Sequence, residues 1–161
     1  MSQLDRLGLI ENPFNNLELR YFYADKNRIE MLVSAEQLID DSSDFQVILG
    51  DHGVGKSHFL VALTEQVDDN QRVVKIIDAS RYNTDNLLQG ILDVLGTKSL
   101  GDDVDLLEVL ETQLSEINTF GFKLILFIDN ADTLSIDSIR FLIQLSQQKQ
   151  AEQSYINIIL F

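Results

Sequence analysis

The sequence contains no cysteine, no tryptophan and one proline, Pro13, and it has no long hydrophobic run. Without cysteine the chain has no disulfide and no zinc–thiolate site, which fits a reducing compartment. No apolar stretch approaches the about 18 residues of a membrane-spanning helix. The first residues also lack the basic start and apolar centre of a signal peptide. We therefore expect a cytoplasmic protein with no membrane contact through this segment.

Positive charge is scarce in the chain. Lysine and arginine total 12 against 26 acidic residues, which gives a formal net charge of −14 over 161 residues. Such an excess repels the phosphates of nucleic acids, so the composition argues against DNA or RNA as a partner. Hydrophobic residues make up 45% of the chain, as in an ordinary soluble domain.

The chain alternates between helical and strand-like patterns. Apolar residues recur at helical spacing in 26–40, 56–67, 84–95, 103–117 and 135–148, and short apolar runs lie at 45–49, 72–79, 123–128 and 156–161. Strands that alternate with helices and are apolar throughout indicate a parallel sheet covered on both faces. The sequence therefore predicts an α/β fold in three layers, a sandwich of helices, sheet and helices.

Two segments are expected along the chain. Residues 1–43 form an N-terminal arm and helix, and residues 44–161 form the α/β core. The polar stretch 144–153 is expected to be the exposed end of a helix and its loop. Because the sequence stops inside the fourth predicted strand, at Phe161, we expect a core truncated after that strand, as a piece of a longer protein.

A phosphate-binding motif follows the first predicted strand. The pattern G-x-x-x-x-G-K-[ST] is met at every fixed position by Gly50, Asp51, His52, Gly53, Val54, Gly55, Lys56 and Ser57. The glycines let successive backbone N–H groups point into one concavity that holds the β- and γ-phosphates, and the helix start adds its dipole. Lys56 is expected to reach the phosphates and Ser57 to ligate Mg²⁺. The N–H of His58 is placed for the α-phosphate.

An acid at the end of a second buried strand completes this kind of site. Asp129 follows the run 124–128, the Walker B pattern, and is expected to hold Mg²⁺ from a strand next to the first one. The following residue is Asn130, which cannot act as a general base for the attacking water. Asp132 is close enough in sequence to act through a water. Lys56, Asp129 and Asn130 are thus the candidate catalytic residues, and hydrolysis stays open.

Several blocks of the chain resemble the general secretion pathway protein A (ExeA-type) ATPases, a branch of the AAA+ class in Gram-negative bacteria. The matching residues are Asn12-Pro13-Phe14, Tyr21-Phe22-Tyr23, the helix with Arg28, Ile29 and Leu32, the motif 47–57, Leu87-Leu88 with Ile91, Leu95-Gly96, and the block 126–134. The resemblance covers nearly the whole chain.

This resemblance implies a P-loop NTPase core with strand order 5-1-4-3-2, ATP or ADP with Mg²⁺ as cofactors, and an N-terminal arm near the adenine. Packing of Phe14 and Tyr23 on the adenine and their packing as ordinary core at the sheet edge both remain open. It further implies a role in secretion or envelope assembly, at the cytoplasmic face of the inner membrane if the full-length protein has a membrane span. Peptidoglycan would be reached through later parts, as in the DamX-related cell-division branch, and full-length copies would associate.

The sequence departs from this family at two places. The family has Asp-Glu where this chain has Asp129-Asn130, and its sensor residue, arginine finger and lid lie beyond the last residue given. A module that binds nucleotide as a switch without turnover is therefore an alternative. A DNA-transposition regulator of the MuB type is a further alternative, which the net charge disfavours.

Overall fold

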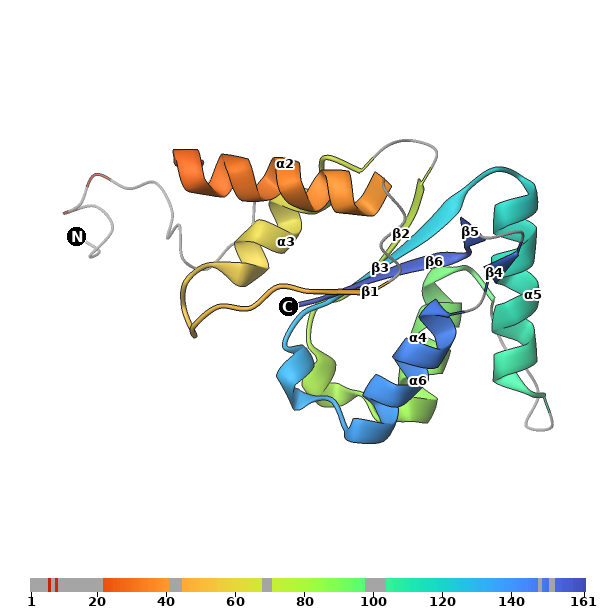
Figure 1. The fold of residues 1–161 in the computed structure, drawn as a ribbon. Helices are drawn as coiled ribbons and strands as arrows, with labels where there is room; N and C mark the ends of the chain where they lie inside the picture. Colours follow the sequence, from red (N-terminus) through yellow and green to blue (C-terminus); the bar gives the residue numbers. More distant parts are fainter. Residues whose placement is uncertain are drawn as a thin grey trace.

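A parallel four-stranded sheet forms the middle layer of the molecule (Figure 1). The computed structural model describes residues 6, 8, 22–40, 45–67, 71–97, 104–147, 149–150 and 153–161. The strands are β1 Phe45–Val47, β2 Gln71–Ile76, β3 Lys123–Ile128 and β6 Ile156–Leu160, in the order β1-β6-β3-β2. Counted along the chain this order is 1-4-3-2, which agrees with four of the five positions that the resemblance implies.

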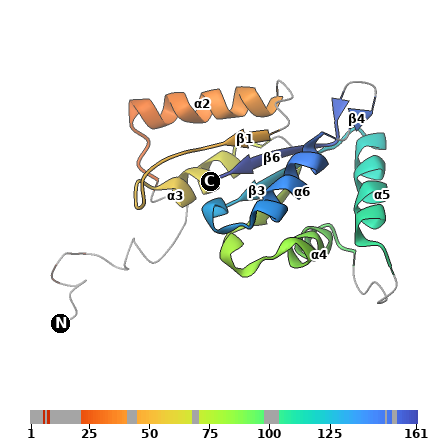
Figure 2. The same ribbon diagram turned by 60° about the horizontal axis from the view of Figure 1, so that its bottom comes forward.

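Helices cover both faces of this sheet (Figures 1 and 2). On one face lie α2 Lys26–Asp40 and α3 Lys56–Thr64, and on the other lie α4 Thr84–Val94, α5 Leu106–Thr119 and α6 Ile136–Ser146. The predicted three-layer α/β arrangement is therefore confirmed. Within the described ranges, no helix has both the length and the apolarity to cross a membrane.

Strand β3 shows why both faces need a cover. Leu124, Leu126 and Ile128 belong to the core shared with α4, α5 and α6, whereas Ile125 and Phe127 belong to the core shared with α2 and α3. Successive side chains of a strand point to opposite faces, and all five are fully buried. An uninterrupted apolar strand of this kind is stable only between two helical layers.

Capping residues set where the helices begin. Ser135 precedes α6, and its hydroxyl accepts a hydrogen bond from the Ser138 N–H at 3.0 Å, as the sequence predicts. The helix predicted from residue 103 begins instead at Leu106. Asp105 caps it by accepting from the N–H groups of Leu107 and Glu108. A side chain that accepts from these first amides has to stand outside the helix, so Asp105 is the boundary.

Two further expectations about local structure are wrong. The helix expected over 56–67 ends at Thr64, whose hydroxyl donates back to the Leu60 and Val61 carbonyls in the last turn. The stretch expected to be helix end and loop contains β4 Lys149–Gln150 and β5 Gln153–Ser154, which pair antiparallel. Polar composition carried no information on backbone pairing in this segment. The division between residues 43 and 44 stays a prediction, since 41–44 lie outside the described residues.

Candidate functional site

All four parallel strands end at one edge of the sheet. The segment after β1 carries the predicted phosphate motif, Asp78 follows β2, Asp129 follows β3, and Phe161 follows β6. In open parallel α/β sheets, ligands bind outside the carboxyl ends of the strands. The predicted site residues therefore gather where this fold offers a binding crevice.

The glycines of residues 50–57, the phosphate loop, are required by its backbone. Gly53 and Gly55 have φ angles of 80° and 97°, a left-handed conformation that side chains with a Cβ rarely adopt. At Gly50 the need is different, because an added Cβ would lie 3.0 Å from Cγ2 of Val54. The loop thus folds back on itself closely, and Asp51 and His52 in it are exposed.

Lys56 is the first residue of α3, and its side chain returns to the loop. Its Nζ donates to the Gly50 carbonyl at 2.9 Å and to the Asp51 carbonyl at 3.3 Å. Backbone carbonyls carry only partial negative charge, so a phosphate oxygen placed beside them attracts this ammonium more strongly. The lysine is therefore held at the loop in a position to serve an anion.

The start of α3 offers backbone donors to the same anion. Gly55 occupies the N-cap position and makes no side-chain capping hydrogen bond, which a serine or aspartate would make there. No capping side chain therefore accepts a hydrogen bond from the backbone N–H groups of the first helical turn, those of Lys56, Ser57 and His58. The N-terminal end of a helix in this condition binds phosphate through its N–H groups and its dipole.

The turn after β3, which carries Asp129, Asn130 and Asp132 and is called the acidic turn below, lies two strands away from β1. Asp129 is buried, and its Oδ1 accepts a hydrogen bond from the Asn130 N–H at 3.0 Å. The motif pattern predicts that its strand lies next to the first one, and this is wrong, because β6 pairs with both β1 and β3. The strand order implied by the resemblance does place the fourth strand between them. Order along the chain does not by itself specify order across a parallel sheet, because a crossover connection can join strands that are not neighbours in the sheet.

Asn130 has a backbone conformation that its side-chain type tolerates. Its φ of 56° and ψ of 38° are left-handed, and it is the one non-glycine residue with positive φ among those described. The short helix η3, Ala131–Thr133, follows, and the Asn130 carbonyl accepts from both the N–H and the hydroxyl of Thr133. Asparagine enters this region more easily than other side-chain-bearing residues.

Two cavities flank the phosphate loop. One, of about 480 Å³, lies between the loop and the acidic turn, and its lining includes His52, Lys56, Asn130 and Asp132. The other, of about 350 Å³, lies between α2 and the loop, and Asp25, Asn27, Arg28, Met31, Val54, Gly55 and Lys56 are among its lining residues. Lys56 lines both, so the two cavities meet at the phosphate loop.

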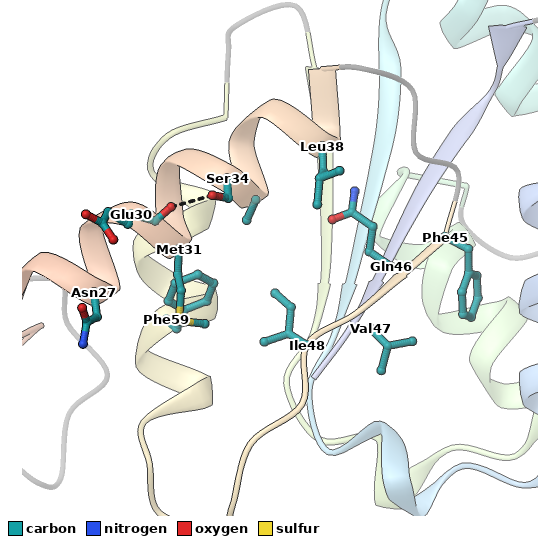
Figure 3. A pocket seen from close by; sticks show the side chains of 11 residues that line it. Asn27, Glu30, Met31, Ser34, Leu38, Phe45, Gln46, Val47, Ile48 and Phe59 are labelled. Atoms are coloured by element: carbon teal, nitrogen blue, oxygen red, sulfur yellow. Dashed lines mark hydrogen bonds between the residues drawn. The ribbon is translucent and has the colours of Figure 1, made fainter.

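A third cavity, of about 710 Å³, runs along β1 and α2 (Figure 3). Met31 from α2 and Phe59 from α3 lie close together at one end, and Gln46 and Leu38 lie at the other. The Gln46 amide nitrogen is buried there without a hydrogen-bond partner. None of the acidic-turn residues lines this groove. It shares Asn27, Met31 and Phe59 with the cavity between α2 and the loop, so the groove adjoins that cavity.

The aromatic residues predicted near the base are placed only in part. Tyr23 is 74% exposed and is not among the lining residues of the cavity between α2 and the loop. Its carbonyl instead accepts a hydrogen bond from Arg28. Phe14 lies outside the described residues. A role for either ring at an adenine stays a prediction.

Asp78, at the end of β2, has a carboxylate held in its charged form. Hydrogen bonding from the Ser80 hydroxyl at 2.6 Å, helped by the Ser80 N–H and by Arg81, lowers the pKa of Asp78 below its usual 3.8, against a smaller opposing effect of burial. The Ala79 N–H beside it donates to the Asp129 carbonyl at 3.1 Å. Asp78 therefore stabilises the turn next to the acidic residue and keeps its own charge there.

The chain is similar to a known protein family and to several solved structures. Residues 39–161 match a family model, AAA_22, described as an AAA domain. Among solved structures, Cdc6p from Pyrobaculum aerophilum is similar with a TM-score of 0.66 and 21% identity, over 86% of this chain and 40% of that one. The ORC2 protein of Aeropyrum pernix, in ADPNP–ADP complexes, is similar with a TM-score of 0.61 and 15% identity, over 86% and 41%. At these identities the likeness concerns the fold. No curated protein matches the sequence.

These solved structures are much longer than the chain, which spans about two fifths of their length. They support the predicted P-loop NTPase fold of the AAA+ class. The secretion branch is not distinguished by any of these comparisons.

The Asn130 backbone predicts a stability pattern. Asn130→Ala is expected to lower the free energy of unfolding by about 1 kcal/mol, because alanine pays the full left-handed penalty. Asn130→Gly is expected to leave it within about 0.5 kcal/mol of the wild type, since relief of strain offsets the greater freedom of the unfolded chain. Urea unfolding of the three proteins tests this. Equal stability of the alanine and glycine variants would contradict the backbone conformation described.

Proposed function

The chain belongs to the AAA domain family, and on that premise we propose that it is an ATP-binding module whose phosphate loop holds the β- and γ-phosphates. The observation that carries the proposal is the Lys56 ammonium, which reaches back to the Gly50 and Asp51 carbonyls beside an uncapped helix start. Three positive elements converge there, namely the ammonium, the loop amides and the helix dipole. In a chain with a net charge of −14, such a concentration favours a polyphosphate ligand.

Mg²⁺ fits the oxygen atoms available at this site. The Ser57 hydroxyl and the Asp129 carboxylate are hard oxygen donors at the start of α3 and the end of β3. In the described part of the chain, no three His, Cys, Asp or Glu side chains are grouped to hold a metal ion by themselves. A magnesium ion that takes one or two protein oxygens and completes its shell with phosphate and water matches this pattern. When bound, it would neutralise phosphate charge.

The two cavities beside the loop suggest how the nucleotide lies. The cavity that contains Asn130 and Asp132 would receive the γ-phosphate end, because Lys56 and His52 also line it. The cavity between α2 and the loop would receive the adenosine part. Its wall combines the apolar Met31 and Phe59 with the polar Asn27, which suits a base that is flat and carries hydrogen-bonding edges.

Asn130 favours a nucleotide switch with slow turnover over an efficient ATPase. Its amide cannot accept the proton of an attacking water. In the cavity between the phosphate loop and the acidic turn, the only carboxylate among the described lining residues is that of Asp132, two residues further on and on the short helix η3. The bound nucleotide would then act through the conformation it stabilises.

The finer part of the proposal is an ExeA-type role in secretion or cell-envelope assembly, with the ATPase module in the cytoplasm. It is supported by the sequence blocks around Pro13, Phe22 and Arg28, in addition to the two nucleotide motifs. In this proposal protein partners of the envelope, peptidoglycan and other copies of the protein are engaged by the full-length chain.

Lys56→Ala is expected to abolish measurable binding of Mg·ATP, since a charged donor to the phosphates is lost, while the fold is kept because the side chain points to the loop. Calorimetric titration with the nucleotide measures the affinity, and thermal unfolding without nucleotide checks the fold.

Lys75→Ala is the matched control, because it removes an exposed lysine of β2 with the same change of charge. Wild-type affinity in the Lys56 variant would refute the phosphate-loop assignment.

Asn130→Glu is expected to raise the steady-state rate of ATP hydrolysis at least about tenfold over a slow wild type, because it supplies the missing general base. Asn130→Ala is expected to remain at the wild-type rate. Phosphate release under saturating Mg·ATP measures all three. A wild-type rate equal to that of the glutamate variant would contradict the switch interpretation.

The envelope role is tested with peptidoglycan. The natural full-length protein is expected to sediment with purified sacculi, whereas residues 1–161 alone are expected to stay in the supernatant. A full-length protein that does not sediment, or a chain that does, would argue against peptidoglycan contact through later parts of the protein.

A further inference from the structure

Arg28, on the first turn of α2, contacts two other segments of the chain through one guanidinium group. Its Nη1 donates to the Tyr23 carbonyl at 3.1 Å, and its Nη2 donates to the Val54 carbonyl of the phosphate loop at 3.2 Å. The Phe22 ring lies below it, with 5.9 Å from the guanidinium carbon to the ring centroid. The segment before α2, the first turn of α2 and the phosphate loop therefore meet at this side chain.

The position of Arg28 is itself well fixed. The Asp25 carboxylate caps α2 by accepting from the Arg28 N–H at 2.9 Å, and the same carboxylate lies 3.8 Å from Nε. The Arg28 side chain is 37% exposed, against 80% for Arg81 and 71% for Arg140, which also pair with an aspartate three residues earlier. Arg28 thus combines such a pair with bonds that cross to other elements, and ordering of its side chain costs less there.

The bond to Val54 determines the direction of a phosphate-binding amide. The carbonyl of Val54 and the N–H of Gly55 belong to one planar trans peptide, so they point in opposite directions. A guanidinium that holds this carbonyl on the α2 side keeps the Gly55 N–H directed away from α2. Gly55 has a φ of 97° and no Cβ, so few steric limits hold this peptide otherwise.

The guanidinium also lies close to the space beside the Gly55 Cα. A Cβ added to Gly55 would lie 3.7 Å from Arg28 Nη2, which is ordinary van der Waals distance. Arg28, Gly55 and Lys56 line the same cavity between α2 and the loop. The arginine therefore packs against the outer side of the peptide whose inner side faces the phosphate site.

We propose that Arg28 is a positioning residue of the nucleotide site, which orients the Val54–Gly55 peptide so that the Gly55 N–H donates to phosphate. This inference rests on the proposed function, since it concerns the same site. It also links the segment 22–25 to the phosphate loop, because the guanidinium that holds Val54 holds Tyr23 as well.

Mg·ATP and Mg·triphosphate, which lacks the adenosine part, are titrated into the wild type and Arg28→Ala. The variant is expected to bind Mg·triphosphate about tenfold more weakly, because the loss of one charge-assisted hydrogen bond loosens the phosphate cradle. Mg·ATP is expected to lose at least the same factor, since Arg28 also lines the cavity assigned to the adenosine part. A loss for ATP with unchanged triphosphate binding would overturn the proposal and assign Arg28 to the adenosine part.

Arg28→Lys and Arg72→Ala complete the comparison. Lysine keeps the charge but lacks the planar fork that holds two carbonyls, so a smaller loss in the same direction is expected. If Arg28→Ala does not fold, wild-type triphosphate affinity in Arg28→Lys overturns the proposal. Arg72→Ala removes an arginine over the Phe122 ring at the far edge of the sheet, 4.9 Å from its centroid, and is expected to bind as the wild type.

The amide resonance of Gly55 in the ligand-free protein gives a second readout. It is expected to shift in both Arg28 variants and not in Arg72→Ala, whereas a general loosening of α2 would leave it in place. An unchanged Gly55 resonance in Arg28→Ala would overturn the proposal. If the wild type binds neither ligand, the proposed function fails, and this resonance still tests whether Arg28 orients the Gly55 amide.

Discussion

The central constraint of the molecule is the hydrogen bonding at the end of β6. The Leu160 carbonyl accepts from the Ile48 N–H at 2.8 Å, at the entry to the phosphate loop. One residue later the Phe161 carbonyl accepts from the Ala131 N–H at 2.9 Å, in the turn after Asp129. Because β6 pairs with both neighbours, the loop and the acidic turn are two strand spacings apart, about 10 Å. That gap contains the cavity assigned to the γ-phosphate end.

Features that depend on nearby residues could be predicted from the sequence. The bounds of α2 and β3, and the Ser135 cap of α6, agree with the structure because spacing of apolar residues and capping chemistry are local. The phosphate loop belongs to the same class. Its glycines all lie within residues 50–55, and the positive φ angles at Gly53 and Gly55 are those the motif needs.

Features that depend on distant residues could not be predicted from local patterns. The insertion of β6 between β1 and β3 agrees with the strand order that the family resemblance implies, but no residue in the Asp129 segment indicates it. The Arg28 contact joins residues 26 apart in sequence, and its donors could equally have faced solvent. The left-handed turn at Asn130 was also missed. The one signal for it is the residue type itself, since asparagine is enriched in that conformation.

Helix α2 is held to the rest of the molecule by hydrogen bonds near both of its ends. Near its start Arg28 joins it to the phosphate loop, and near its end the Ile39 carbonyl accepts from Asn157 Nδ2 at 2.8 Å and from Lys123 Nζ at 3.3 Å. Between these hydrogen bonds the helix spans the groove along β1 (Figure 3). The bond near the start of α2 is made to the phosphate loop, whereas the bonds near its end are made to strands of the sheet. Movement of the phosphate loop would therefore displace the start of α2 more than its end, and would widen the groove at its Met31 end more than at its Leu38 end.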